Sequence, residues 1–330
     1  MVRNPREFRI GLIGSGGRGM HLRDVANRAD RASVVCAADL GGVNFDRLRA
    51  EGVAVYDDFE EMLKTEGVDI AIVATPIPTH YAVARRVLDF PLSGLYLEKS
   101  IATRLSEADE LVSVAAGNDT CFVVGHQLRY SRGWADARDM LDAGMIGEAQ
   151  VVRARRGAAL LTHHTHQTDL MRYYLRDCPA SWVIGQVHRD GHHLSEGMQS
   201  EAQSLGYVQF ENGVSGIIES GAYGDNPGNT ITITGETGEI RVGSDARFRS
   251  EDTGGRWEPI PEYTHPNIFD DFITWIEGGP RHRCAASSGR DTLELLLAIY
   301  ESARSRGRVD IPLARRGNAL EEMLAEGLMA

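Results

Sequence analysis

The chain has 330 residues, 42% of them apolar, which is enough to fill two hydrophobic cores, so we expect two packed units. Its formal net charge of -12 argues against a nucleic-acid binder and against a polybasic membrane anchor. The four cysteines lie far apart without a CxxC pair, which suggests neither a disulfide framework nor a structural zinc site. No stretch approaches the ~20 apolar residues of a membrane span, and the N-terminal apolar run is too short for a signal sequence, so we expect a cytoplasmic protein.

Strands and helices alternate in the first part of the chain. Phe8 to Ile13 predicts a strand that runs into the glycine-rich GSGGRG, and a helix is expected from about Met20 to Ala26. Further buried-type strands are expected at 33–38, 53–56, 68–74, 95–97 and 122–125, with helices at 79–88 and 106–116. Near-continuous apolar strands separated by helices predict an α/β fold with a doubly wound parallel sheet that is covered on both faces.

The pattern changes after a bridging helix at 134–143. A hairpin with Asn212-Gly213 at its tip, an alternating strand at 230–235 and a turn at 236–238 are typical of an antiparallel or mixed sheet. Amphipathic helices are expected at 291–302 and after Pro312. The sequence therefore predicts two domains, 1–127 with the parallel sheet and 128–330 with a large open sheet and helices on one face.

The glycine-rich turn is the first candidate site. Gly14, Gly16 and Gly19 match GxGxxG after a strand and before a helix, where they allow a tight turn, close approach of a pyrophosphate, and close packing of the helix on the strand. Asp39 follows at the end of the next strand, ~20 residues on, where a carboxylate binds the ribose of a dinucleotide. A carboxylate there repels the extra phosphate of NADP, and Leu40-Gly41 brings no arginine, so NAD is favoured over NADP.

Further segments stand in a fixed order behind this turn. They are Ala74-Thr-Pro-Ile-Pro-Thr-His80, Leu97-Glu-Lys-Ser100, Gly125-His-Gln-Leu-Arg-Tyr130, Gly144-Met-Ile-Gly147 and His166-Gln-Thr-Asp169. They resemble the ATPxxxH, EKP, GxNxRF, GxIG and HxxD segments of the glucose-fructose oxidoreductase, inositol dehydrogenase and MocA family. Several motifs in one order are more specific than any one of them, and the resemblance covers nearly the whole chain.

The resemblance implies a Rossmann domain followed by an α/β domain with an open sheet, in an NAD(P)-dependent enzyme that oxidises a sugar, inositol or related polyol. It places Thr75, Pro76, His80 and Gln127 beside the cofactor and Glu98 and Lys99 at the nicotinamide. The expected cofactor-binding set is Gly14, Ser15, Gly16, Gly17, Arg18, Gly19, Asp39, Thr75, Pro76, His80, Glu98, Lys99 and Gln127. The expected substrate-binding set is Lys99, Arg129, Thr162, His163 and His166.

Two positions depart from the family pattern. Ser100 replaces the proline of EKP, which puts the shape of the loop around Lys99 in question. Thr162 stands where the family often has an aspartate four residues before its histidine. The second departure concerns proton transfer directly, because that aspartate belongs to the family's DxxxH segment.

Oxidation of a secondary alcohol needs a base for the hydroxyl proton, a positive group near the developing alkoxide, and a hydride acceptor. His166, Lys99 and NAD can supply these three functions, since histidine titrates near pH 6.5. On a helix, Asp169 at i+3 lies on nearly the same face as His166, so it is expected to orient the ring. The alternatives for these residues are a helix-packing carboxylate at Asp169 and an ordinary strand-end lysine at Lys99.

The segment LTHHTHQTD holds three histidines, and His163 and His166 have an i,i+3 spacing that can grip a metal. No HExxH or CxxC accompanies them, so no metal site is expected. The other interpretations are a substrate contact from His163 or His164, or polar side chains without a role in the site. Arg129, Arg153, Arg155 and Arg156 could bind an acidic sugar such as a uronate or could be charges on a strand face.

The leading hypothesis is an NAD-dependent dehydrogenase of a sugar or cyclitol, with His166 as the base and Lys99 assisting. A second is a glycoside hydrolase that uses NAD transiently for oxidation, elimination and return of the hydride. A third is a non-catalytic NAD-binding sensor. By resemblance, the open sheet face is expected to pair with another subunit in a homodimer or homotetramer, with a small-molecule carbohydrate or polyol as the ligand.

Overall fold

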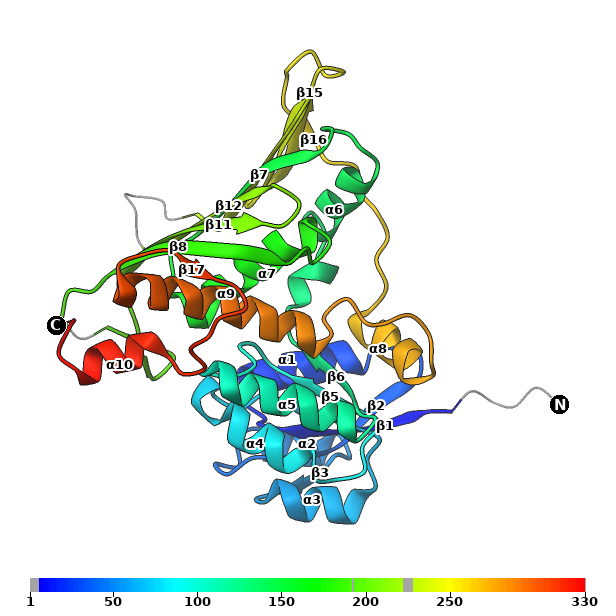
Figure 1. Cartoon of the computed structure of the whole chain (residues 1–330). Coiled ribbons are helices and arrows are strands. Elements are labelled where there is room, and N and C mark those ends of the chain that lie inside the picture. Colours follow the sequence, from blue (N-terminus) through cyan, green and yellow to red (C-terminus); the bar gives the residue numbers. More distant parts are fainter. Residues whose placement is uncertain (1–5, 192, 222–227, 330) are drawn as a thin grey trace. The chain divides into compact units, whose positions relative to one another are not determined.

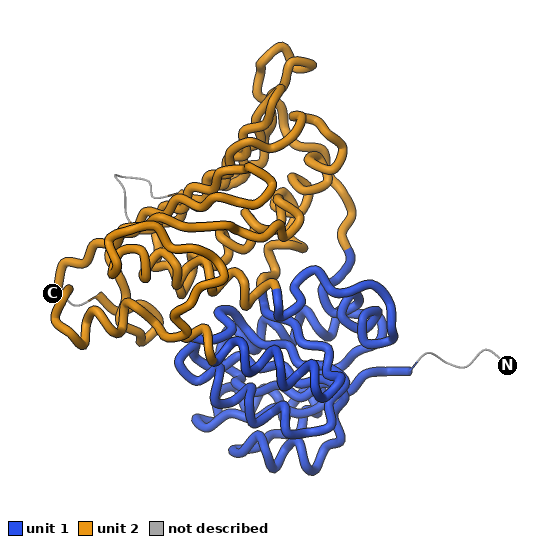
Figure 2. Tube along the Cα trace, in the orientation of Figure 1, with its two compact units in different colours: residues 1–102, 107–125, 266–287 blue, residues 103–106, 126–265, 288–330 orange. Residues whose placement is uncertain are grey.

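The computed structural model describes residues 6–191, 193–221 and 228–329. The chain forms two compact units (Figure 2): unit 1 contains residues 1–102, 107–125 and 266–287, and unit 2 contains residues 103–106, 126–265 and 288–330. A division of the sequence at 127/128 therefore differs from the packing, because a segment from the second half returns to unit 1.

Unit 1 is built on a parallel sheet with six described strands in the order β3-β2-β1-β4-β5-β6 (Figure 1). The strands are β1 (Phe8–Ile13), β2 (Ala32–Ala38), β3 (Ala54–Tyr56), β4 (Ile70–Val73), β5 (Gly94–Leu97) and β6 (Cys121–Val124). This is the strand order of a dinucleotide-binding Rossmann sheet. Strands β1 to β3 extend towards one edge of the sheet and β4 to β6 towards the other, so the switch in strand order lies between β1 and β4. The parallel, buried sheet expected from the apolar runs is thus confirmed.

Helices connect these strands. They are α1 (Gly17–Ala26), α2 (Phe45–Ala50), α3 (Phe59–Glu66), the short 3-10 turn η1 (Ile77–Thr79), α4 (His80–Val87) and α5 (Leu105–Gly117). Every residue of β4 and β5 is buried, as expected for strands covered on both faces. All six carboxyl ends meet at one edge of the sheet, which gathers the loops that carry the motifs.

Residues 266–287 join unit 1 through an apolar helix, α8 (Ile268–Ile276). Phe269 stacks on Tyr96 of β5 with ring centroids 5.1 Å apart. A Cβ on Gly94 would lie 2.7 Å from the Phe272 ring, so glycine is required there for the helix to approach the strand. Ala285 then forms a β-bridge with Val123 of β6. The late return of the chain is therefore part of the core of unit 1.

Unit 2 is built on a mixed sheet with nine described strands in the order β16-β15-β14-β13-β7-β12-β11-β8-β17. The strands are β7 (Ala149–Arg156), β8 (Ala180–His188), β11 (Gln203–Phe210), β12 (Ser215–Gly221), β13 (Thr230–Gly235), β14 (Gly238–Val242), β15 (Ala246–Ser250), β16 (Glu258–Pro259) and β17 (Val309–Asp310). Strands β7 and β12 are parallel and the other neighbours are antiparallel. A separate small hairpin pairs β9 (Leu194–Ser195) with β10 (Met198–Gln199).

Helices cover one face of this sheet. Those that pack on it are α6 (Trp134–Asp142), α7 (Thr165–Tyr174) and α9 (Ala286–Ser305). Unit 2 also contains the 3-10 turn η2 (Gln127–Tyr130), the π-helical turn η3 (Leu160–His164) and α10 (Ala319–Ala325). A Cβ on Gly206 would lie 2.5 Å from Ile299, so α9 packs directly on β11. On the opposite face Ile184 is 48% exposed and Leu205 52% exposed. The expected open sheet with helices on one face is confirmed. Within the described residues, no helix combines the length and apolar character that a membrane crossing requires.

Candidate functional site

The glycine turn of unit 1 has the geometry that a bound pyrophosphate needs. Gly14 has φ +89°, and a Cβ on Gly19 would lie 1.9 Å from the Gly14 carbonyl oxygen, so neither position tolerates a side chain. A Cβ on Gly16 would meet no atom within 4 Å, which leaves open space over the backbone at the start of α1. The residues present therefore fit a dinucleotide, with its phosphates at the helix N-terminus.

Asp39 lies beside this turn at the end of β2. Its carboxylate accepts hydrogen bonds from the backbone N–H groups of Ser15 and Gly41, both 2.9 Å long. The neighbouring Leu40 is 97% exposed and provides no cation. A negative charge fixed at this position suits a ribose with free hydroxyls and disfavours an added phosphate.

His80 joins two of the expected cofactor loops. Its Nδ1 lies 2.7 Å from the Ser100 carbonyl oxygen and its Nε2 lies 2.7 Å from the Thr75 carbonyl oxygen. The ring is buried, and burial lowers the pKa of His80. Its contacts thus tie the loop after β4 to the loop after β5, while Thr75 and Pro76 lie at the carboxyl edge of the sheet.

Glu98 and Lys99 follow β5 at the same edge. The buried Glu98 carboxylate accepts a hydrogen bond of 2.8 Å from Nε of Arg18, the residue before the last glycine of the turn. The backbone N–H of Lys99 contacts the other Glu98 oxygen at 3.3 Å, and the Lys99–Ser100 peptide bond is cis. Arg18 and Glu98, both expected at the cofactor, therefore also hold each other and fix the backbone before Lys99.

The histidine-rich segment of unit 2 forms η3 and the first turn of α7. A π-helical turn inside a helix often marks a functional site. The N–H of Leu160, where η3 begins, donates a 2.6 Å hydrogen bond to the buried Glu201 carboxylate. Burial raises the pKa of Glu201, which also accepts a hydrogen bond from the Tyr300 hydroxyl. This anchor fixes the start of the segment against the sheet.

The side chains in this segment have separate partners. Thr162 is buried and its hydroxyl lies 2.8 Å from the Ser195 hydroxyl. His163 is partly exposed and pairs with Glu196 at 3.2 Å. His164 is buried, contacts the Glu219 carbonyl oxygen at 3.0 Å, and burial lowers its pKa to about 4.

His163 and His164 contact different partners and do not converge on one point. The absence of a metal at His163 and His166 stays an expectation. Among the described residues, one group could hold an ion: Asp136, Asp139 and His265. The carboxylate of Asp136 in this group already has two hydrogen-bond partners: it accepts from the Gly133 N–H at 2.7 Å and contacts His265 Nε2 at 2.7 Å.

Arg129 is the centre of a buried ion network. Its guanidinium is 1% exposed and forms a forked contact with Asp169, at 2.7 Å from Nε and 2.8 Å from an Nη. It also contacts Asp177 at 2.9 Å and the Ser288 hydroxyl at 2.8 Å. Although burial alone would raise it, the Arg129 guanidinium holds the pKa of Asp177 well below its usual range. Two carboxylates thus engage the buried guanidinium, and the expectation that Arg129 also contacts substrate stays a prediction.

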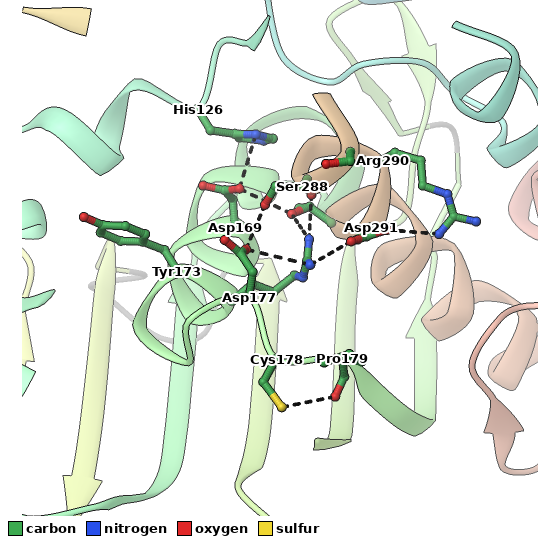
Figure 3. Close-up of polar contacts among 12 residues, drawn as sticks. His126, Asp169, Tyr173, Asp177, Cys178, Pro179, Ser288, Arg290 and Asp291 are labelled. Atoms are coloured by element: carbon green, nitrogen blue, oxygen red, sulfur yellow. Dashed lines mark hydrogen bonds and ion pairs between the residues drawn. The ribbon is translucent and has the colours of Figure 1, made fainter. Parts of the chain in front are cut away.

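Asp169 contacts a histidine that the sequence analysis did not single out. Its Oδ1 lies 3.4 Å from His126 Nδ1, and the expected orienting contact with His166 stays a prediction. The His126 Nε2 lies 3.0 Å from the Thr165 hydroxyl, and its ring meets the His166 ring edge-on, with centroids 5.8 Å apart and an angle of 84°. Both rings are buried. Figure 3 shows His126 above Asp169, on the side away from Asp177.

Sequence reasoning missed three members of this network: His126, Asp177 and Ser288. His126 stands inside GHQLRY, where it takes a position that the family pattern leaves open, so a histidine beside a motif glycine was the available signal. Asp177 and Ser288 belong to no motif and meet Arg129 only through the fold. Gln127 begins η2 and, like His166 and Asp169, belongs to unit 2, while Lys99 belongs to unit 1.

Two family models match the chain. The oxidoreductase family with an NAD-binding Rossmann fold (GFO_IDH_MocA) matches residues 8–126. The GFO/IDH/MocA C-terminal domain matches residues 153–241. Unit 1 is thus an NAD-binding Rossmann domain, and the two matches together span both units.

Similar proteins include several with named activities. The rhizopine catabolism protein MocA of Rhizobium meliloti is 24% identical, covering 89% of this chain and 94% of that protein. The scyllo-inositol 2-dehydrogenase (NAD(+)) of Bacillus subtilis is 24% identical over 72% of this chain and 74% of that one. The 2,7-anhydro-N-acetylneuraminate hydratase of Escherichia coli is 23% identical over 74% and 70%. Among solved structures, the WlbA dehydrogenase of Chromobactrium violaceum with NADH and UDP-GlcNAcA has a TM-score of 0.78 at 21% identity, covering 95% of this chain and 99% of that one.

Proposed function

The chain belongs to the glucose-fructose oxidoreductase, inositol dehydrogenase and MocA family of NAD-binding oxidoreductases, and we propose that it oxidises a secondary hydroxyl group of a sugar, cyclitol or related polyol. One observation carries this proposal. His166 is buried in the first turn of α7 with its ring against His126, in a chain whose other unit has an NAD-binding glycine turn. When bound, NAD supplies an acceptor for the hydride that leaves the carbinol carbon.

In this proposal His166 removes the hydroxyl proton. An imidazole suits this role because its ordinary pKa of about 6.5 lies close to working pH. The neighbouring His126 has its Nδ1 3.4 Å from the Asp169 carboxylate. The negative charge of this carboxylate stabilises a positive charge on the pair of imidazole rings. The Arg129 contacts hold that carboxylate in one orientation.

The pairing of His126 with Asp169 gives a reason why Thr162 can replace the family's aspartate. A carboxylate at 162 would neutralise the imidazolium that forms during proton removal. Here Asp169 contacts His126, whose ring meets the His166 ring edge-on, and Thr162 contacts Ser195. We propose that this edge-on pair of histidines links His166 to the Asp169 carboxylate.

Lys99 completes the proposed set from unit 1. A lysine near the reacting hydroxyl stabilises the negative charge that develops on its oxygen. The backbone on both sides of Lys99 is fixed, since Arg18 engages Glu98 and His80 contacts the Ser100 carbonyl oxygen. These contacts support a defined position for Lys99 despite the change from proline to Ser100.

A second candidate is a reaction in which oxidation is transient. The 2,7-anhydro-N-acetylneuraminate hydratases of Escherichia coli and Mediterraneibacter gnavus are 23% and 22% identical to this chain. In such a sequence, oxidation acidifies a neighbouring C–H bond, and removal of that proton expels the leaving group and forms a double bond. Water then adds to the double bond, and return of the hydride restores the alcohol. This NAD-dependent glycoside hydrolase would use the same His166 and Lys99.

The test is to incubate the protein with NAD and a panel of hexoses, uronates and inositols while following NADH absorbance, with aryl glycosides in parallel. Stoichiometric NADH formation is the expected result. Glycoside cleavage without net NADH would favour the hydrolase, and silence in both assays with NAD bound would favour a sensor. His188→Ala is the matched control for His166→Ala, because His188 is exposed at the end of β8 and belongs to none of the expected binding or catalytic sets.

We also propose that the open face of the unit 2 sheet pairs with a second copy of the chain. Trp182 and Tyr207 stack there at 5.4 Å, beside the exposed Ile184 and Leu205. A contiguous apolar surface on a sheet typically marks an interface. A homodimer or homotetramer would cover it.

We place this activity in the cytoplasm. All four cysteines are free thiols, which is the state that a reducing compartment maintains. Cys36 and Cys284 are buried, and the packing around them accommodates a thiol, which behaves there as a small apolar side chain.

A further inference from the structure

A cavity of about 500 Å³ in unit 2 lies outside the residues discussed so far. Its lining includes Trp134, Arg155, Asn229, Thr230, Arg241 and Ser244. Its volume falls within the usual range for small-molecule sites, ~300–1,000 Å³. The lining combines a flat indole, two guanidinium groups, an amide and two hydroxyls.

The cavity lies where several strands end. Arg155 is the penultimate residue of β7 and pairs in register with Thr230, the first residue of β13. Arg241 is the penultimate residue of β14, next to β13 in the sheet. Both arginines therefore come from the same end of the two strands that flank β13, and Trp134 is the first residue of α6.

The same strand end leads to the proposed base. Residue Arg156 follows Arg155 and ends β7, and its guanidinium donates a 3.1 Å hydrogen bond to Gln167, the neighbour of His166. Four residues after Arg156 the chain enters η3 and then α7. A ligand in the cavity would therefore lie at the end of the sheet from which the His166 helix begins.

The charge of the cavity stands out against an acidic chain. The formal net charge is -12, yet the cavity lining has two arginines and, among its described residues, no carboxylate. Three arginines on nearby strands have carboxylate partners: Arg153 lies 3.8 Å from Glu219, Arg249 lies 3.5 Å from Glu239, and Arg247 lies 2.6 Å from Asp245. Arg241 has no such partner among the residues that the structure describes.

We propose that this cavity binds the carboxylate of a sugar acid, with the acid group at Arg155 and Arg241 and the apolar face of the ring against Trp134. A guanidinium matches a carboxylate in a planar, charge-assisted contact, and Asn229, Thr230 and Ser244 offer partners for ring hydroxyls. This proposal rests on the proposed function, because it names the class of polyol that the oxidoreductase takes as substrate.

The test measures binding to the full chain in the presence of NAD by titration calorimetry and tryptophan fluorescence. The ligands are D-glucuronate, D-galacturonate and D-gluconate, each compared with its neutral partner D-glucose, D-galactose or D-glucitol. At least one acid is expected to bind roughly tenfold or more tightly than its partner, and its affinity should fall as salt rises. If no acid binds more tightly than its neutral partner, the proposal is overturned.

Arg241→Gln is the decisive variant, because Arg241 is exposed and its replacement does not threaten folding. It should weaken the preferred acid about tenfold and leave the neutral sugar unchanged, while Arg247→Gln, on the next strand, should change neither. Trp134→Phe should remove the fluorescence change. Equal weakening of acid and neutral sugar by Arg241→Gln contradicts the proposal.

Two further arms separate related outcomes. Glucose 6-phosphate and inorganic phosphate test for a phosphate site, and tighter binding of either than of every acid overturns the assignment to a carboxylate. Binding needs no turnover, so His166→Ala is expected to retain the acid preference. A failure of NADH formation with the acid preference intact would thus refute the proposed oxidation and leave the cavity assignment standing.

Discussion

Removal of the Arg129 guanidinium should destabilise unit 2 strongly. In Arg129→Met the apolar stem is approximately conserved, but Asp169 keeps a buried negative charge whose forked contacts at 2.7 and 2.8 Å are lost. Asp169 is 1% exposed, so water cannot replace the guanidinium. Breaking one side of a buried pair costs about 3–5 kcal/mol. For a domain of this size, roughly 2–4 °C per kcal/mol converts this to a fall in Tm of roughly 6–20 °C.

Arg132→Met is the matched control, because Arg132 lies three residues on and its ion pair with Glu262 is exposed at the surface. An exposed pair contributes about 0–1 kcal/mol. Thermal and urea unfolding of both variants, followed by near-ultraviolet circular dichroism, gives the comparison. The double variant Arg129→Met with Asp169→Leu should regain part of the loss, since it removes the buried charge as well. Equal midpoints for Arg129→Met and Arg132→Met would refute the reasoning.

Three more outcomes follow from the structure. Asp39→Ala should lower the preference for NAD over NADP, measured as the ratio of their Kd values; an unchanged ratio would show that Asp39 does not read the ribose. His164 has a folded pKa of about 4 against an ordinary 6.5, so the folded protein binds fewer protons between these values and stability should fall as pH drops from 6.5 towards 4, by up to roughly 3 kcal/mol. His164→Gln should flatten that pH dependence in urea unfolding, and an unaltered slope would contradict it. Ile184→Glu should lower the mass measured by light scattering after gel filtration, whereas a monomeric unmodified protein would refute the interface.

Local features of the chain were predictable from sequence. The glycine turn depends on contacts within one strand, turn and helix, so Gly14, Gly16 and Gly19 identify it directly. The alternating strands of unit 2 were visible for the same reason, since each exposes one face. The return of residues 266–287 to unit 1 was not visible, because Phe269 and Phe272 find their partners Tyr96 and Gly94 about 175 residues away.

The candidate site shows the same division. The i,i+3 spacing placed Asp169 and His166 on one helix face. It could not show that Arg129 and His126 contact the Asp169 carboxylate. His163 and His164 are adjacent in sequence, yet one is partly exposed and the other is fully buried. Successive residues of a helix point in directions that differ by ~100°, so neighbours can face solvent and core. Environment, which decides the chemistry of a histidine, is set by long-range packing.

The fate of the carbinol hydrogen tests the central claim most directly. A substrate identified in the panel is prepared with deuterium on the carbon that bears the reacting hydroxyl and is incubated with the protein and NAD. Mass spectrometry should find one deuterium per NADH, in equal amount with the oxidised product, and His166→Ala should abolish this transfer while His188→Ala retains it. Deuterium that returns to the product without accumulating in NADH, or full transfer by His166→Ala, would contradict the account.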